Sequence, residues 1–268
     1  MSALFSALLP LALATRSTYL DALHALQPTL PHVVELPAAT TTPGASLNSA
    51  GSPRLDQDVP FHIASPAQLS SLLSTYAAGN ISIPLNITLP VGATNSVPWI
   101  TLLLWLPPRF AQRATAWPTV FHLHGADEGI DGQCSECYWP AAAAPLRRIA
   151  GHGLPHRIEY RTPFNEQFVL VSPQRPPTNN ITGDGYDHQW EEPSVMGALE
   201  QLRLYLFGTV KRLDASRAYL TGLSHGGDGV WNWALHSPLH TWAGIVPVAS
   251  RWPVFIEPEL NQHGTSMD

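Results

Sequence analysis

Short apolar runs separated by long connections fill the second half of the chain. Val, Ile, Leu and aromatic residues make these runs nearly continuous, as in strands that are buried on both faces of a parallel sheet. Leucine spacing predicts a helix over 195–213, and a second helical stretch covers 226–236. This alternation predicts an α/β fold with a mostly parallel central sheet flanked by helices. The predicted strands are 98–106, 119–123, 168–172, 218–221 and 243–248.

The first part of the chain has a different pattern. Residues 36–60 are rich in Pro, Ser, Thr, Gly and Ala without an apolar period, which predicts a linker or a segment wrapped on the surface. Helical spacing predicts a helix over 66–78, and strict alternation over 81–89 predicts a half-buried strand. We therefore expect an N-terminal extension over 15–96 and a core over 97–268.

The N-terminus carries the features of a candidate signal peptide over residues 1–14. Its apolar run ends in a small-x-small triplet, which a signal peptidase accepts, although the run lacks a preceding Lys or Arg. A buried N-terminal helix is the alternative. Asn80, Asn86 and Asn180 begin glycosylation triplets that fit a secretory route. We expect a secreted or secretory-pathway protein, with a cytoplasmic location as the alternative.

Composition excludes several classes of partner. The net charge is −6 and Lys211 is the sole lysine, so no basic stripe can neutralise nucleic-acid phosphates. No apolar run reaches the roughly 18 residues that a membrane-spanning helix needs. Cys134 and Cys137 lack the second pair of a thiolate zinc site, which leaves a local disulfide, free thiols, or redox or metal chemistry open. We expect no metal and no cofactor.

The strongest motif is G-x-S-x-G-G, which follows a predicted strand and precedes a predicted helix. This context is typical of a nucleophile elbow, in which Ser224 stands in a strained turn above the sheet. Gly222 and Gly226 flank the serine because side chains there would clash. The N–H of His225 would point to the place where an oxyanion forms. A plain glycine-rich turn is the alternative.

A second oxyanion donor is expected after an earlier strand. The strand 119–123 ends in His124-Gly125, where a glycine would let the chain bend over the serine. We assign the second donor to the N–H of Ala126. The alternative for His122 and His124 is a structural role, in which each bonds to the backbone.

Segments between residues 97 and 250 resemble the α/β-hydrolase superfamily in unbroken order. They are most similar to the branch of esterases, predicted peptidases and dienelactone hydrolases, which includes polyhydroxybutyrate-depolymerase-like and feruloyl-esterase-like enzymes. The segments are WITLLLWLPPRF, WPTVFHLHGADEGIDG, GHGLPHRIE, FVLVSPQRPP, QW and LDASRAYLTGLSHGGDGVWNWALHSPLHTWAGIVPVAS.

The resemblance implies a role for each matching residue. Ser224 matches the nucleophile, while His225 and Ala126 match the oxyanion donors. Trp190 matches a tryptophan that shapes the acyl or leaving-group pocket. Two positions depart from the family, because Asp127 stands where a glycine is usual and position 225 is more often methionine.

The acid and histidine of a catalytic triad are not evident. In this fold they follow the serine along the chain, and the family places them after strands beyond 243–248. Only 20 residues follow Val248, too few for two further βα units. We expect missing C-terminal strands and an exposed sheet edge, through a shortened gene model or splice form, a truncated relic, or completion by a partner or missing segment. The weak candidates are Glu257, Glu259, His263, Asp268 and, upstream, His188.

These features predict a serine hydrolase that acts on small-molecule or polymer carboxylic esters by acyl transfer. Amide or peptide cleavage would use the same parts. The alternative is an inactive α/β-hydrolase-like binding protein, in which the pocket remains without the triad.

Overall fold

The computed structural model describes residues 45–47, 53–55, 60–90, 97–129, 145–160, 167–176 and 190–250. Several sequence predictions lie outside these residues. They are the candidate signal peptide over 1–14, Cys134, Cys137, Asn180, His188, Glu257, Glu259, His263 and Asp268.

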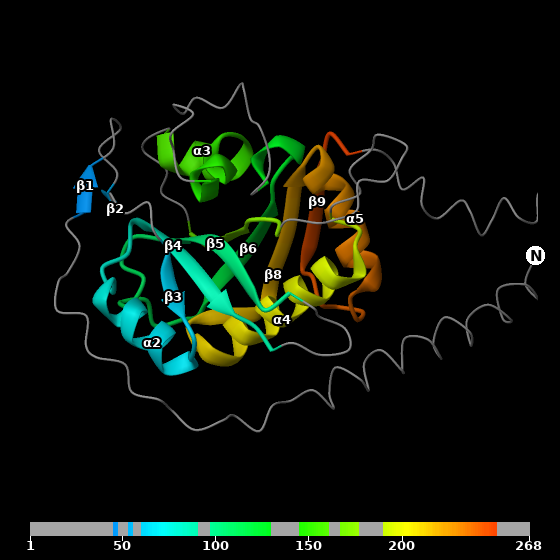
Figure 1. Cartoon of the computed structure of the whole chain (residues 1–268). Coiled ribbons are helices and arrows are strands. Elements are labelled where there is room, and N and C mark those ends of the chain that lie inside the picture. The colour runs from blue at the N-terminus through cyan, green and yellow to red at the C-terminus, as the bar shows by residue number, and fades with distance from the viewer. Residues whose placement is uncertain are drawn as a thin grey trace, which may run out of the picture. The chain divides into compact units, whose positions relative to one another are not determined.

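One sheet of nine strands organises the described residues, with helices on either side (Figure 1). The strands are β1 (Ala45–Leu47), β2 (Pro53–Leu55), β3 (Phe61–Ile63), β4 (Ile81–Thr88), β5 (Trp99–Leu106), β6 (Trp117–Leu123), β7 (Val169–Pro173), β8 (Leu213–Leu223) and β9 (Gly244–Val248). The helices are α2 (Pro66–Thr75), α3 (Gly153–Tyr160), α4 (Pro193–Thr209) and α5 (His225–His236), with 3₁₀ turns η1 (Ala126–Glu128) and η2 (Pro145–Ala150).

The strand order is β1-β2-β4-β5-β7-β6-β8-β9, with β3 paired to β4. The strands β7, β6, β8 and β9 are parallel neighbours, whereas β5 is antiparallel to both β4 and β7. A helix crosses between β7 and β8 and another between β8 and β9. The predicted α/β fold with a mostly parallel sheet is therefore confirmed, and the predicted strand 98–106 corresponds to β5, which is antiparallel to its neighbours.

Strand β5 separates two layers of the core. Successive side chains of a strand point to opposite faces. Leu102 and Leu104 join the large apolar cluster that includes residues of α2, α4 and α5. Leu103 packs with η2, and Trp105 packs with Ile158 of α3. Figure 1 accordingly shows α3 on the side of the strands opposite α2 and α4.

Helix α2 begins with a complete capping box. The Ser65 hydroxyl accepts a hydrogen bond from the Gln68 N–H, and the Gln68 side chain accepts one from the Ser65 N–H. Pro66 occupies the first helical position, where its missing N–H costs nothing. These local signals explain why the helix predicted over 66–78 forms, although it ends at Thr75.

Strand β4 differs from its prediction. Its alternating pattern suggested one solvated face, yet Ser82 is buried. The reason is that α3 covers this face, and Ser82 lines a small cavity together with Pro155 and Ile158.

The N-terminal extension also joins the sheet. Strand β4 pairs with β5 along its whole length, so described residues on both sides of position 96 belong to one sheet. The segment 36–60, expected to be a linker, contains the short antiparallel strands β1 and β2. Three-residue strands carry no readable period, which is why the sequence pattern missed them.

Among the described residues, β9 lies at the edge of the sheet and pairs only with β8. Its residues are partly or fully exposed, and Val246 is 60% exposed. The prediction that this strand is buried on both faces is therefore wrong for the part of the chain described.

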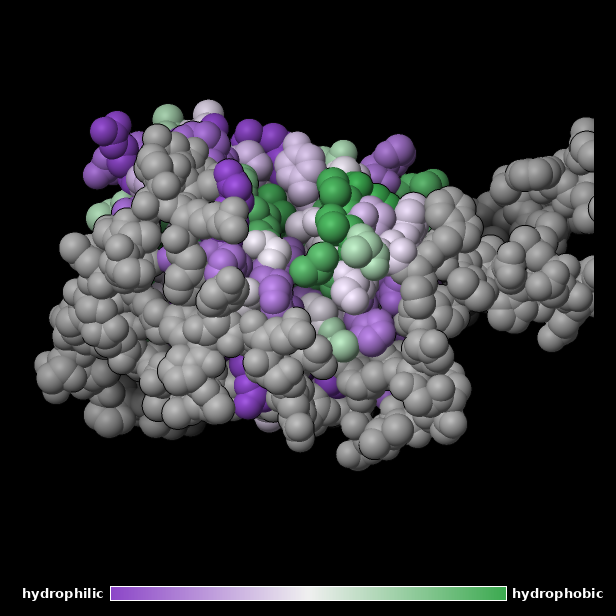
Figure 2. Space-filling view, turned by 90° about the horizontal axis from the view of Figure 1, so that it is seen from above, coloured by the Kyte–Doolittle hydropathy of each residue, from purple (hydrophilic) through white to green (hydrophobic). Residues whose placement is uncertain are grey.

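Seen from above, hydrophobic residues gather on one part of the described surface with hydrophilic residues around them (Figure 2). No helix among the described residues is long and apolar enough to cross a membrane.

The core layering predicts how much one leucine contributes. Leu102 is fully buried in β5, whereas Leu239 is 73% exposed after α5. We expect Leu102→Ala to lower the free energy of unfolding by about 2–5 kcal/mol through lost burial and a residual cavity. The matched Leu239→Ala should stay within about 0.5 kcal/mol of the wild type. Urea denaturation measures both, and equal effects would contradict the described burial.

Candidate active site

Ser224 lies in a strained turn between β8 and α5. Its φ is 56° and its ψ is −122°, which is rare for a residue with a side chain. Backbone contacts hold the turn, because the Ser224 N–H donates to the Val248 carbonyl at 2.8 Å and its own carbonyl accepts from Gly227 N–H at 2.7 Å. The serine side chain is exposed. This geometry is that of a nucleophile elbow.

Backbone crowding requires glycine on both sides of the serine. A Cβ at Gly222 would lie 2.3 Å from the Gly226 carbonyl oxygen, and a Cβ at Gly226 would lie 2.0 Å from the Leu123 carbonyl oxygen. No Cβ is found so close to backbone atoms. The two glycines therefore allow α5 to start directly against the ends of β8 and β6.

The loop after β6 lies beside the serine. A Cβ at Gly125 would lie 3.9 Å from the Ser224 Cβ and 3.6 Å from the Leu223 carbonyl oxygen. Gly125 itself has an ordinary extended conformation, with φ −73° and ψ −178°, and has space for a Cβ. The expectation that this bend requires glycine is thus wrong, while the expected closeness of loop and serine is found.

The structure brings the two expected N–H donors to helix starts. Ala126 is the first residue of η1 and His225 is the first residue of α5. N–H groups in a first helical turn have no intrahelical partner, so they remain free to bind an anion. Within the described part of the chain, neither N–H donates a hydrogen bond to another residue.

His124 is a structural histidine at the end of β6. It is 1% exposed, its Nε2 accepts from the Arg175 N–H at 3.0 Å, and its Nδ1 lies 2.6 Å from the Gly125 carbonyl oxygen. Because Nε2 accepts, Nδ1 carries the proton and donates to Gly125. Burial lowers the pKa of His124 to about 3, so the ring is neutral near pH 7. The alternative of a backbone-bonded histidine is confirmed here.

Trp190 lies behind the same loop. Its indole is buried, and the indole N–H donates to the His124 carbonyl at 3.0 Å. The His124 and Trp190 rings are packed edge to face, with 4.9 Å between their centroids. The Trp190 carbonyl accepts from the Asn232 side chain of α5. Trp190 therefore joins the loop to α5, and its role in shaping a pocket stays a prediction.

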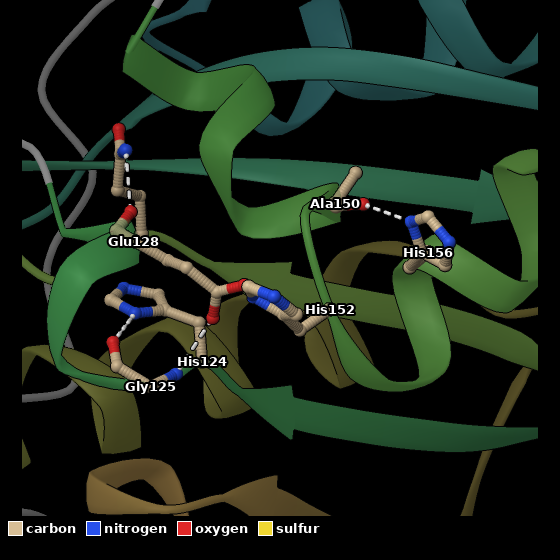
Figure 3. A network of polar contacts seen from close by, with 7 residues as sticks. His124, Gly125, Glu128, Ala150, His152 and His156 are labelled. Carbon is tan, nitrogen blue, oxygen red and sulfur yellow. Dashed lines mark hydrogen bonds and ion pairs between the residues drawn. The ribbon is translucent and has the colours of Figure 1, made fainter. Parts of the chain in front are cut away.

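Glu128, which no sequence prediction named, is the most buried acid of this region. It is 2% exposed, and its Oε2 accepts from the Gly125 N–H at 2.8 Å (Figure 3). Its Oε1 lies 2.9 Å from Nδ1 of His152, which immediately precedes α3. Burial raises the pKa of Glu128, and these hydrogen bonds oppose that rise. A glutamate three residues after a cap position is a capping-box signal that could have revealed it.

The remaining predicted residues are less informative. Asp127 lies in η1, and the described part of the structure does not extend to its side chain. His225 is partly exposed, and its Nδ1 is buried without a hydrogen-bond partner among the described residues. No histidine of the described part donates to or accepts from the Ser224 hydroxyl. Nor does that part hold three His, Cys, Asp or Glu side chains placed to share a metal ion.

A serine in a strained turn between a parallel strand and its crossover helix, beside the loop that follows the neighbouring strand, is the arrangement of an α/β-hydrolase fold. The chain is similar to a thermostable esterase, with 19% identity and a TM-score of 0.42, covering 67% of this chain and 44% of that one. It is also similar to a poly(3-hydroxybutyrate) depolymerase from Bordetella parapertussis, with 15% identity and a TM-score of 0.42, covering 68% of this chain and 55% of that one.

The chain spans about half the length of these two solved structures. No protein-family model matches the sequence, and no curated protein matches it. The fold assignment therefore rests on the strand order and on the turn at Ser224.

The crowding at the elbow predicts a clear cost for one methyl group. Gly226→Ala should lower the free energy of unfolding by at least about 1–3 kcal/mol, because the added Cβ would overlap the Leu123 carbonyl oxygen. A Cβ added at Gly208 of α4 would meet no atom within 4 Å. Gly208→Ala should raise the free energy of unfolding by about 0.5–1 kcal/mol through better helix propensity. Chemical denaturation compares the two, and equal shifts would contradict the described elbow.

The buried histidines predict acid sensitivity. Burial lowers the pKa of His122 to about 4 and that of His124 to about 3, below the 6.5 of an unfolded histidine. The unfolded chain then binds more protons below pH 6.5, so stability is present above pH 6.5 and is lost as pH falls toward 4. Each histidine should contribute a slope of about 1.4 kcal/mol per pH unit in that window. Urea unfolding between pH 4.5 and 6 should show a shallower slope in His122→Gln, and an unchanged slope would contradict the burial.

Proposed function

We propose that the protein is a serine hydrolase of carboxylic esters and that Ser224 is its nucleophile. The observation that carries this proposal is the positive φ of Ser224 at the start of α5. Strain of this kind costs about 1–3 kcal/mol and persists where the surrounding structure holds it, most often at functional sites. The exposed Ser224 hydroxyl could attack a substrate, and the adjoining loop at Gly125 could bind the oxyanion that this attack forms.

The reaction follows from the positions of these groups. The Ser224 hydroxyl would attack the ester carbonyl while a base takes its proton. The carbonyl oxygen becomes negative and would accept hydrogen bonds from the N–H groups of His225 and Ala126, the largest single contribution in many acyl transfers. The C–O bond to the alcohol then breaks while the protonated base gives its proton to the departing alcohol, which leaves an acyl-serine. The base next takes a proton from water as the water oxygen attacks the acyl carbon, and it returns that proton to Ser224 as the acid is released.

The base and its acid partner are the remaining parts of this proposal. In this fold the triad order along the chain is serine, acid and histidine. We therefore place both residues C-terminal to β9, outside the described residues. Amide or peptide bonds would be cleaved by the same steps, with an amine as the leaving group.

A binding protein without catalytic activity is the second candidate. It is favoured by one observation, namely that no histidine in the described part of the chain bonds to the Ser224 hydroxyl. Under this alternative the elbow would be retained as a structural turn.

A fluorophosphonate probe separates the two candidates, because it forms a covalent bond only with an activated serine. We expect the wild-type chain to be labelled and to hydrolyse an activated aryl ester. Ser224→Ala should abolish labelling and lower kcat at least about 10³-fold. Ser70→Ala, at an exposed serine of α2, should behave as the wild type. A folded wild-type chain that neither labels nor hydrolyses the ester would favour the binding protein.

A further inference from the structure

Gly125 is held at both of its backbone polar groups. Its N–H donates to Glu128 Oε2 at 2.8 Å, and its carbonyl accepts from His124 Nδ1 at 2.6 Å. The carbonyl of Gly125 and the N–H of Ala126 belong to one trans peptide, so they point in opposite directions. The His124 contact on the Gly125 carbonyl therefore also orients the Ala126 N–H. Glu128 binds the Gly125 N–H, which belongs to the preceding peptide, so it sets the position of Gly125 from which the Gly125–Ala126 peptide continues.

Glu128 is itself held from two sides. His152 contacts its Oε1 at 2.9 Å, which leaves Oε2 for Gly125, and the Gln174 side chain donates to its backbone carbonyl at 3.2 Å. In Figure 3 the Glu128 side chain extends from η1 toward His152, above the loop formed by His124 and Gly125. The partners come from the segment after β7 and from the start of α3, so two separate parts of the chain immobilise one glutamate.

A buried carboxylate is costly unless it is paired and hydrogen-bonded. Glu128 satisfies that requirement, but a helix cap on a three-residue turn could be made by a smaller exposed residue at lower cost. Its carboxylate contacts the backbone of the residue that also faces Ser224. The Glu128 carboxylate is therefore better placed to fix the backbone of the loop after β6 than to stabilise the fold as a whole.

We propose that Glu128, fixed by His152, is a positioning residue that aims the Ala126 N–H at the oxyanion formed beside Ser224. This inference rests on the proposed hydrolase function. Glu128 acts only through the backbone, because its carboxylate holds the His124–Gly125 peptide and thereby fixes where the following Gly125–Ala126 peptide begins. His152 serves to keep the carboxylate in the one orientation that reaches Gly125.

The test compares Glu128→Ala with Glu128→Gln. A glutamine oxygen can still accept from the Gly125 N–H, so Glu128→Gln should keep kcat within about threefold, while Glu128→Ala should lower kcat about 10²-fold with KM little changed. His152→Ala should lower kcat about tenfold, because the carboxylate keeps its contact but loses its orientation. Glu159→Gln, in the buried ion pair of α3 with Arg147, should lose stability without a change in kcat.

Hydrogen exchange gives a second measure that does not depend on catalysis. The Gly125 amide should exchange at least about tenfold faster in Glu128→Ala than in the wild type, and near the wild-type rate in Glu128→Gln. If the wild type shows no serine-dependent labelling, the hydrolase proposal fails, while faster Gly125 exchange would still establish the contact.

Two outcomes would overturn the positioning role. Unchanged kcat and unchanged Gly125 exchange in Glu128→Ala would show that the loop does not depend on the carboxylate. Loss of labelling in His152→Ala as complete as in Ser224→Ala would show that His152 acts as the base itself. If Glu128→Ala does not fold, exchange and kcat of His152→Ala decide between these outcomes.

Discussion

The backbone approach between α5 and the ends of β6 and β8 is the constraint on which the rest of the site depends. Gly226 lies so close to the Leu123 carbonyl that no side chain fits between them. This approach forces the positive φ of Ser224 and places its side chain outside the sheet. The hydrogen bond from the Ser224 N–H to the Val248 carbonyl adds β9 to the same structure, so Ser224 is held by three strands and a helix.

Buried polar groups hold the other part of the candidate site, the loop that follows β6. The neutral ring of His124 joins the Gly125 carbonyl to the Arg175 backbone, and Trp190 closes the loop from behind. Glu128 contributes the only carboxylate in this arrangement among the described residues. Because the site lies at the carboxyl ends of parallel strands, the loop after β6 meets the connection that follows β7, which supplies Arg175 and Trp190.

Part of the sheet was predictable because β5 and β7 are buried along nearly their whole length and therefore appear as uninterrupted apolar runs. β8 is partly exposed and was predictable from the strand context of the glycine-serine motif, while α4 follows its leucine spacing. The direction of β5 was not predictable, since an apolar run shows burial but not orientation. The burial of Ser82 in β4 was missed for a related reason, because α3 is distant along the chain and its position over the sheet leaves no mark in the local alternation.

The sequence by itself determined the position of Ser224, the glycines around it and the strand-to-helix context of the elbow, because the strand, the glycine-serine motif and the helix follow one another in one short segment. The contact that makes glycine necessary at Gly226, with the Leu123 carbonyl, comes from the tertiary structure. Only the tertiary structure decided what holds the opposing loop. Glu128 and His152 are 24 residues apart, and their pairing depends on where the start of α3 comes to lie over the sheet. The sequence also suggested that a glycine at 125 lets the chain bend, whereas the structure shows an ordinary backbone there and room for a Cβ at van der Waals distance from its neighbours.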